Sequence, residues 1–274
     1  MTQGRSVRPC LSDSPVVLFA QVRASAGYVC SSVATAPSVS AGTTAPQDEA
    51  AVSQNATMSR SPNFCVGLYG VTYDFCVERE RLMRAVARAV WGIDMSVLYA
   101  SMEAIGRVHD GATILDAPCG GGVAFRALRA DQDVRYVAAD ISKQMLARAQ
   151  RRAERRSLNR VEFVLADLCA LPFVDEQADL FLSYSGLHML EDPERAVSEI
   201  GRCLKPGGEL VGTALLAEGS RRQRTICGIG RRRGYPVPPS GHDVRRWLMA
   251  VGIAEPTIEP ERGFAVFRGR KDAD

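Results

Sequence analysis

Between residues 112 and 216, short apolar runs alternate with longer segments whose apolar residues recur at helical spacing. The apolar runs cover residues 112–117, 134–140, 161–167, 178–184 and 209–216. A chain that alternates strands and helices in this way covers both faces of a parallel sheet with its helices. The alternation therefore predicts an α/β fold with a doubly wound, mostly parallel sheet.

Segments on either side of this core extend the prediction. Residues 257–261 and 264–269 are typical of two strands that lie close together, as an antiparallel pair at one edge of the sheet. Before the core, apolar residues recur every four positions from Leu82, so residues 58–106 are expected to form a cap of helices.

Residues 1–57 differ in composition from the rest of the chain. They contain 24 Ser, Thr or Ala residues and only six charged side chains. Such a segment cannot bury enough apolar surface to offset the entropy lost on ordering. We therefore expect a disordered leader, or a start assigned too far upstream with Met58 as the initiator, followed by a single domain over residues 58–274.

Charge and cysteine usage exclude several classes of protein. The 34 basic and 31 acidic residues give a net charge of +3, which is too balanced to predict nucleic acid as the main partner. No apolar run approaches the roughly 18 residues of a membrane-spanning helix. The eight cysteines include no C-x-x-C pair and have no histidine at ligand spacing, so we predict no metal site. Reduced, buried cysteines suit a cytoplasmic protein.

Acidic side chains stand at the ends of three successive strands, at Asp116, Asp140 and Asp167. Ligands of such sheets bind outside the carboxyl ends of the strands. Gly120 and Gly122 follow the first acid and let the backbone turn tightly and approach a ligand. One such aspartate is as readily a strand-end or helix-capping carboxylate, but three beside a glycine loop favour a site for a nucleoside.

Two classes of cofactor share this outline. The dinucleotide fingerprint G-x-G-x-x-G needs a glycine where this chain has Phe125. In addition, Asp116 is badly placed beside a diphosphate but suits the ammonium group of an amino acid. The residues therefore favour S-adenosyl-L-methionine over NAD.

Residues 110–216 resemble a class I, seven-stranded S-adenosylmethionine-dependent methyltransferase, of the small-molecule branch that includes the ubiquinone/menaquinone-biosynthesis enzymes. The likeness rests on the glycine loop, on DISKQMLARAQ (140–150), on ADLCALPF (166–173) and, most specifically, on the stretch from strand 178–184 to PGG (206–208). The resemblance implies ten cofactor-binding residues: Asp116, Ala117, Gly120, Gly122, Asp140, Ile141, Met145, Asp167, Leu168 and Ser183. The chain departs from the family at Pro118, which replaces a usual glycine and removes one N–H donor.

Candidates for the acceptor side are Tyr73, Tyr184, His188 and Arg222. His188 follows the fourth strand and could deprotonate an acceptor, because the pKa of a histidine is near neutral, although the family often has a structural histidine here. Residues 217–240 carry six arginines and are expected to form an acceptor lid in which Arg222 grips an anion. A solvated surface helix is the alternative for this segment.

Five further arginines share one side of the helix predicted over residues 142–156, and we expect them to form a solvated face: Arg148, Arg151, Arg152, Arg155 and Arg156.

The expected activity is methyl transfer to an oxygen, nitrogen or carbon atom of a small molecule. The sulfonium is an activated leaving group, so the protein mainly has to align the reactants, and the sequence says little about the acceptor. Two alternatives stay open. One is a non-catalytic module that binds the cofactor or, through its arginines, RNA; the other is a nicotinamide-dependent oxidoreductase.

Overall fold

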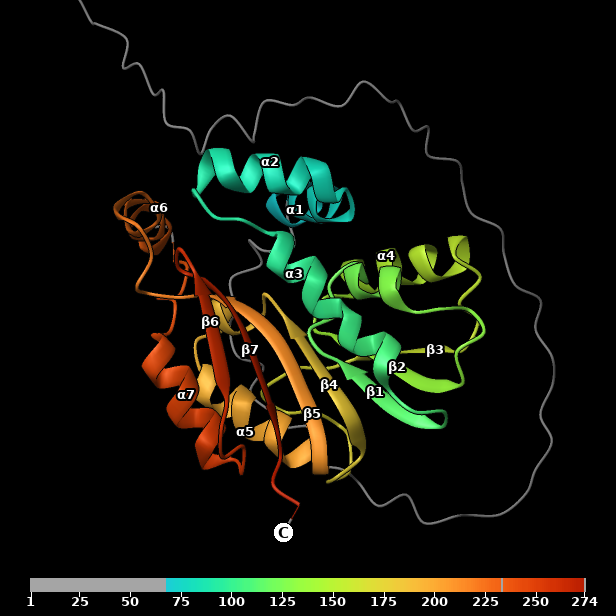
Figure 1. Cartoon of the computed structure of the whole chain (residues 1–274). Coiled ribbons are helices and arrows are strands. Elements are labelled where there is room, and N and C mark those ends of the chain that lie inside the picture. Colours follow the sequence, from blue (N-terminus) through green and yellow to red (C-terminus); the bar gives the residue numbers. More distant parts are fainter. Residues whose placement is uncertain (1–67, 233, 274) are drawn as a thin grey trace, which may run out of the picture. The chain divides into compact units, whose positions relative to one another are not determined.

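The strands predicted from the apolar runs are present and form one sheet (Figure 1). They are β1 (Ala112–Asp116), β2 (Val134–Asp140), β3 (Val161–Leu165), β4 (Ala178–Tyr184), β5 (Leu204–Leu215), β6 (Thr257–Glu261) and β7 (Phe264–Arg270). The computed structural model describes residues 68–232 and 234–273. The predicted leader, residues 1–57, lies outside the described residues.

The strand order across the sheet is β3–β2–β1–β4–β5–β7–β6. The first five strands along the chain pair in parallel, whereas β7 runs antiparallel to both β5 and β6. The predicted antiparallel pair is therefore confirmed, with β6 at the edge. From β1 the chain builds outward through β2 and β3, then returns to add β4 on the other side. The crevice between β1 and β4 is the point where ligands of such sheets bind.

Helices cover both faces of the sheet. They are α1 (Leu68–Glu78), α2 (Glu80–Val90), α3 (Ser96–Ser101), α4 (Lys143–Arg155), α5 (Pro193–Cys203), α6 (Arg221–Arg231) and α7 (Gly241–Ala250), with short 3-10 helices η2 (Met102–Arg107), η3 (Val123–Ala127) and η4 (Leu187–Met189). Helices α5 and α7 pack together on one face, and α3 crosses β5 and β7 on the other (Figure 1). None of the described helices is long and apolar enough to cross a membrane.

The core under α5 and α7 follows from the two-residue period of the strands. Leu115 and Phe181 are paired neighbours on β1 and β4, and both are fully buried. Ile200 of α5 and Leu248 of α7 belong to the same buried cluster. Each such side chain contributes about 1.5–3 kcal/mol by leaving water, so this layer fixes the sheet that carries the site.

On the opposite face, Phe125 packs edge-on against two aromatic rings, at 5.4 Å from the ring centroid of Tyr136 and 6.2 Å from that of Phe163. The Phe125 ring also lies against Gly122, where a Cβ atom would collide with it. Phe125, which stands where the dinucleotide fingerprint needs a glycine, is thus a core side chain. The position of its ring in turn requires a glycine at position 122.

Two helical segments are not regular α-helices. The segment after the glycine loop is the short 3-10 helix η3, and within the predicted cap of helices the segment that follows α2 is divided into α3 and η2. At this junction the Ser101 hydroxyl donates to the Leu98 carbonyl at 2.7 Å, a local bond that competes with the regular helix pattern.

Gly212 provides a test of this packing. A Cβ atom there would collide with the Phe267 ring and lie 2.7 Å from the backbone oxygen of Ser183. We expect Gly212→Ala to lower the free energy of unfolding by about 1–3 kcal/mol in urea denaturation. Gly106→Ala is the control, because a Cβ atom at position 106 meets nothing within 4 Å. Equal stability of the two variants would contradict the description of β5.

Candidate active site

The carboxylate of Asp140 holds the glycine loop in place at the end of β2. One oxygen, Oδ2, accepts a hydrogen bond from the Gly120 N–H at 2.8 Å, and Oδ1 accepts one from the Ser142 N–H at 2.8 Å. Ser142 in turn caps α4, since its Oγ accepts from the Met145 N–H. Burial raises the pKa of Asp140, whereas the two N–H donors favour its charged form. The loop after β1 and the start of α4 are therefore tied to one side chain.

Asp116, at the end of β1, is a second buried carboxyl group and is only 1% exposed. The Tyr136 hydroxyl donates to Oδ2 at 2.8 Å, while Oδ1 has no hydrogen-bond partner among the described residues. Burial raises the pKa of Asp116 to about 7 against the effect of the Tyr136 bond, and the charge of Asp140 raises it further. A buried acceptor without a partner, near its pKa at neutral pH, suits a cationic ligand.

The loop between these acids depends on its glycines. Gly120 and Gly122 have φ values of +53° and +79°, which only glycine adopts readily. The Cys119 N–H donates to the Ala139 carbonyl at 2.8 Å, and the Ala117 N–H donates to the Leu182 carbonyl at 3.0 Å. Burial holds the pKa of the Cys119 thiol well above its usual value, so the thiol stays protonated and is no nucleophile.

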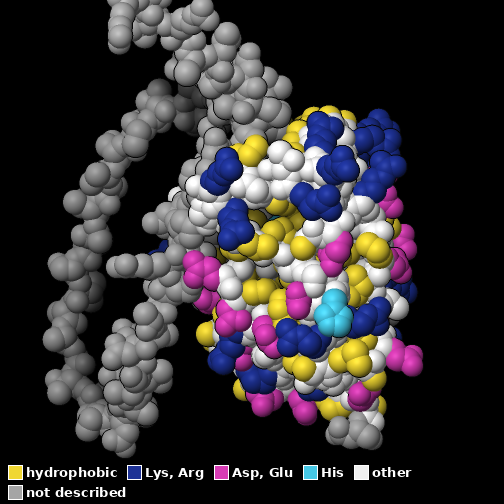
Figure 2. All heavy atoms as spheres, turned by 90° about the vertical axis from the view of Figure 1, so that its left-hand side faces the viewer, with side chains coloured by type: hydrophobic (Ala, Val, Ile, Leu, Met, Phe, Trp, Pro, Cys, Tyr) yellow, Lys and Arg dark blue, Asp and Glu magenta, His cyan; other side chains and the backbone are white. Residues whose placement is uncertain are grey.

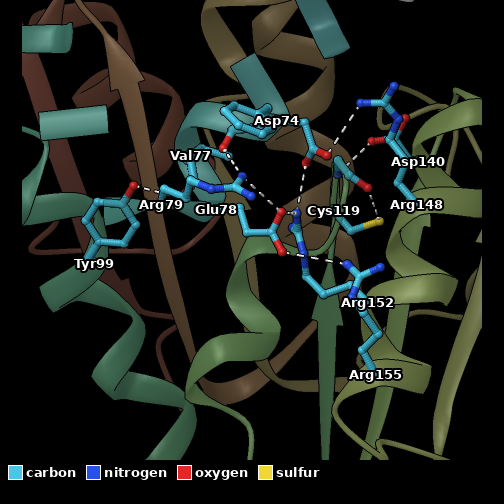
Figure 3. Close-up of polar contacts among 12 residues, drawn as sticks. Asp74, Val77, Glu78, Arg79, Tyr99, Cys119, Asp140, Arg148, Arg152 and Arg155 are labelled. Carbon is cyan, nitrogen blue, oxygen red and sulfur yellow. Dashed lines mark hydrogen bonds and ion pairs between the residues drawn. The ribbon is translucent and has the colours of Figure 1, made fainter. Parts of the chain in front are cut away.

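Helix α1 covers this loop. Asp74 is buried, and a Cβ atom on Gly121 would collide with its carboxylate. Figure 3 shows the carboxylates of Asp74 and Glu78 pointing at guanidinium groups of α4. Four ion pairs connect the two helices: Asp74–Arg148 at 3.5 Å, Asp74–Arg152 at 3.4 Å, Glu78–Arg152 at 3.3 Å and Glu78–Arg155 at 3.6 Å.

The expected solvated arginine face of α4 is therefore wrong for Arg152, which is only 7% exposed. The pattern of α4 shows which side is charged but not that a helix some 75 residues earlier brings carboxylates to it. Asp74 is also a site neighbour to which no role was assigned from the sequence, although it follows the candidate Tyr73 directly. A loose likeness to the family around Tyr73 and Asp74 was its only signal.

Tyr73 and Ser185 come together between α1 and the end of β4, where the Tyr73 hydroxyl donates to Ser185 Oγ at 3.3 Å. Burial raises the pKa of Tyr73. Ser183, one of the predicted cofactor residues, is fully buried, and its Oγ has no hydrogen-bond partner among the described residues. Tyr184 is buried in the core, where burial and the charge of Asp116 raise its pKa.

His188 lies on η4 beside the end of β5. Its Nδ1 accepts a hydrogen bond from the Leu215 N–H at 3.3 Å, and burial lowers its pKa to about 4. A neutral imidazole that accepts at Nδ1 carries its proton on Nε2. In this state the ring is neutral, and its bond to Leu215 supports the end of β5.

The remaining predicted cofactor residues lie at the ends of β2 and β3, which are adjacent in the sheet. The Ala166 N–H donates to the Asp140 carbonyl at 3.1 Å and brings Asp167 to the same edge. Leu168 is buried and Met145 is half-buried, whereas Ile141 is 46% exposed, which is unusual for a large apolar side chain. These residues form an apolar border beside the two acids.

Arg222 has a partner that the sequence did not suggest. Its guanidinium donates to the Ala89 carbonyl at the end of α2, so it contacts the helical cap. Within the described part of the chain, no group of three or more His, Cys, Asp or Glu side chains is arranged to hold a metal ion.

Comparison with known families agrees with this geometry. Residues 115–212 match the family described as a methyltransferase domain. This part of the chain, less than half of its length, is similar to methyltransferase domains. It includes the end of β1, all of β2, β3 and β4 and most of β5, and with them most of the residues gathered at the carboxyl ends of these strands.

Curated relatives share this domain over part of their length. An uncharacterized chloroplastic methyltransferase of Arabidopsis thaliana is 35% identical over 114 residues, which is 40% of this chain and 32% of that protein. The demethylmenaquinone methyltransferase of Clavibacter sepedonicus is 41% identical over 101 residues, which is 37% of this chain and 40% of that protein. The matched stretch thus spans less than half of either relative.

Solved structures show the same fold at low identity. Phosphoethanolamine N-methyltransferase 2 of Haemonchus contortus, in complex with phosphomonomethylethanolamine and S-adenosylhomocysteine, has a TM-score of 0.57 at 17% identity, covering 65% of this chain and 53% of that chain. The [4+2]-cyclase SpnF has a TM-score of 0.56 at 19% identity, covering 75% of this chain and 96% of that chain. The likeness establishes a Rossmann-like methyltransferase fold.

The raised pKa of Asp116 gives a prediction about stability. Between its ordinary pKa of 3.8 and about 7, the folded chain keeps a proton that the unfolded chain releases, so stability falls as the pH rises through this range. Relative to Asp116→Asn, the natural chain should lose up to about 4 kcal/mol of unfolding free energy. Urea denaturation from pH 4 to pH 8 measures this. A pH-independent effect of Asp116→Asn would refute the assignment.

Proposed function

We propose that the protein is an S-adenosyl-L-methionine-dependent methyltransferase that acts on a small-molecule acceptor. The observation that carries the proposal is the buried Asp116, whose Oδ1 has no protein partner among the described residues, beside a loop with two glycines at positive φ. Because a cyclase has the same fold, the fold does not decide the reaction. The residues at the carboxyl ends of the strands have to carry the argument.

Each of these residues fits one part of the methyl donor. Asp116 would accept from the ammonium group, and the loop of Gly120 and Gly122 would lie along the amino-acid part. Asp140 uses one lone pair of Oδ2 for the loop and one of Oδ1 for the start of α4, and would keep the others for ribose hydroxyls. Asp167 and Leu168 would contact the adenine, with Ile141 and Met145 at its border. Ala117 and Ser183 would line the floor of the site between the residues at the amino-acid part and those at the adenine.

When bound, S-adenosylmethionine supplies an activated methyl group. The protein then has to align the acceptor and exclude water, which accounts for a large part of the barrier in such displacements. Helix α1 performs the second task, since Asp74 closes over the loop and Tyr73 bonds Ser185 beyond it. On the acceptor side we retain the proposal that residues 217–240 form a lid.

The nicotinamide alternative has less support, because the Phe125 ring is part of the core and leaves no glycine at the third position of the fingerprint. For the compartment we propose the cytoplasm. Five cysteines of the described part are free thiols, as is usual where the environment is reducing.

Donor binding tests the first assignment. Asp140→Asn should raise the Kd for S-adenosylhomocysteine about 10- to 100-fold in calorimetry, because an amide NH2 would face a backbone N–H of the loop and one ribose acceptor is lost. Asp133→Asn removes an exposed carboxylate before β2 and should leave the Kd unchanged. Binding of NADH in place of S-adenosylhomocysteine would overturn the proposal.

A second prediction concerns His188. In a screen of acceptors with labelled donor, the substrate found should be methylated by His188→Gln with a kcat within about threefold of the natural chain. The reason is that Gln can still accept from Leu215, and a group with a pKa of about 4 is no base near neutral pH. A loss of more than a hundredfold, together with loss of an ionisation from the pH profile, would make His188 the general base.

A further inference from the structure

A cavity of about 190 Å³ lies between α6 and the segment that leads to α7. Leu216, Val237 and Pro238 form apolar walls, and the cavity-facing residues of α6 include Arg224, Cys227 and Arg231. An apolar cavity of about 150 Å³ is large enough for benzene, so this one holds a body about the size of one substituted aromatic ring.

The spacing of the residues along helix α6 places several of them on the side that faces the cavity. Arg224, Gly228 and Arg231 lie at positions i, i+4 and i+7, on one side of the helix. Gly228 keeps the wall open, since a Cβ atom there would meet nothing within 4 Å. A glycine in mid-helix costs about 1 kcal/mol relative to alanine, so the open wall is maintained against helix propensity.

The floor of the cavity is rigid. Gln223 is only 1% exposed, and its Nε2 donates to the Leu216 carbonyl at 3.1 Å and to the Gly263 carbonyl at 2.9 Å. These bonds fix the first turn of α6 to the end of β5 and to the turn between β6 and β7. The cavity is therefore built into the fold on the side of the sheet edge formed by β7 and β6.

Two positive charges at this cavity lack a counter-charge. The guanidinium groups of Arg224 and Arg231 have no hydrogen-bonded or ion-paired partner among the described residues, whereas that of Arg222 is bonded to the Ala89 carbonyl. Helix α6 contains no acidic residue, and the nearby Glu218 accepts from the Gly241 N–H at 3.0 Å. Figure 2 faces this side and shows basic side chains around apolar surface in its upper part. Guanidinium groups in such a setting bind carboxylate or phosphate.

The cavity also lies on the acceptor side of the site. Leu216 follows Leu215, whose N–H bonds His188, and β5 is separated from β1 only by β4. Adjacent strands are about 4.8 Å apart, and β5 continues four residues beyond Val211, which stands level with Asp116, so the ends of β5 and β1 are about 16 Å apart. An acceptor held at the end of β5 therefore has to span this distance to meet a methyl donor held at the end of β1.

We infer that this cavity binds one end of the acceptor, and that this end is an aromatic or similarly compact apolar group with one anionic group, which Arg224 and Arg231 hold. The inference rests on the proposed function, because it names the substrate class of the same site. Arg222 was the expected ligand of an anionic acceptor, but its guanidinium contacts α2. Arg224 and Arg231, on the cavity face, take this role instead.

Calorimetry on the full chain with benzoate, phenyl phosphate and benzyl alcohol tests the inference. At least one anion should bind tenfold or more tightly than the neutral alcohol, and comparison of the two anions distinguishes a carboxylate site from a phosphate site. The double variant Arg224→Gln, Arg231→Gln should weaken anion binding at least tenfold. The control pair Arg221→Gln, Arg232→Gln removes the same charge from α6 and its cap without altering the cavity and should leave the Kd unchanged.

A second variant separates the cavity from the charge. Gly228→Leu should abolish binding of all three probes, because the side chain fills the cavity, while its higher helix propensity preserves the fold, as thermal denaturation will verify. Its Kd for S-adenosylhomocysteine should equal that of the natural chain. If S-adenosylhomocysteine fails to bind the natural chain while the anions bind in an arginine-dependent way, the donor assignment is wrong and the anion site is supported.

Three results would overturn the inference: no binding of any probe, equal binding of the alcohol and the anions, or anion binding unaffected in the Arg224→Gln, Arg231→Gln variant. A single-stranded RNA that binds this face more tightly than the anions and displaces them would assign the arginines to a nucleic acid instead.

Discussion

The carboxylate of Asp140 is the interaction on which the candidate site depends. A buried charge needs hydrogen-bond donors, and here the donors are the N–H groups of Gly120 and Ser142. The first fixes the loop after β1, and the second fixes the entry to α4. The Asp140 carbonyl also accepts from Ala166 and so holds the end of β3. One residue thereby sets the relative position of three strand ends.

Asp116, at the end of the neighbouring strand β1, has a different set of hydrogen-bond partners from Asp140. It has one protein donor, Tyr136, and the charge of Asp140 acts against its ionisation. Each oxygen of Asp140 has an N–H donor from the fold, whereas Oδ1 of Asp116 has no partner among the described residues. The difference between the two carboxyl groups is thus decided by the number of N–H and O–H groups that face each one.

The sequence predicts well what depends on periodicity and strand ends. The sheet, the antiparallel pair and the gathering of Asp116, Asp140 and Asp167 at one edge all follow from the apolar runs, since parallel strands present their carboxyl ends together. It predicts poorly what depends on contacts between distant segments. The burial of Arg152 requires carboxylates from α1, and Arg222 finds a carbonyl of α2. The pattern of a single helix contains no information about such partners.

The two sides of the site are held by forces of different kinds. The sheet rests on apolar packing under α5 and α7, whereas α1 is tied to α4 by carboxylate–guanidinium pairs that include Asp74 and Glu78. Dissolved salt weakens ion pairs, most of all the exposed ones, but leaves apolar burial intact or strengthens it. A rise in ionic strength therefore weakens the attachment of α1 over the glycine loop without weakening the sheet beneath the loop.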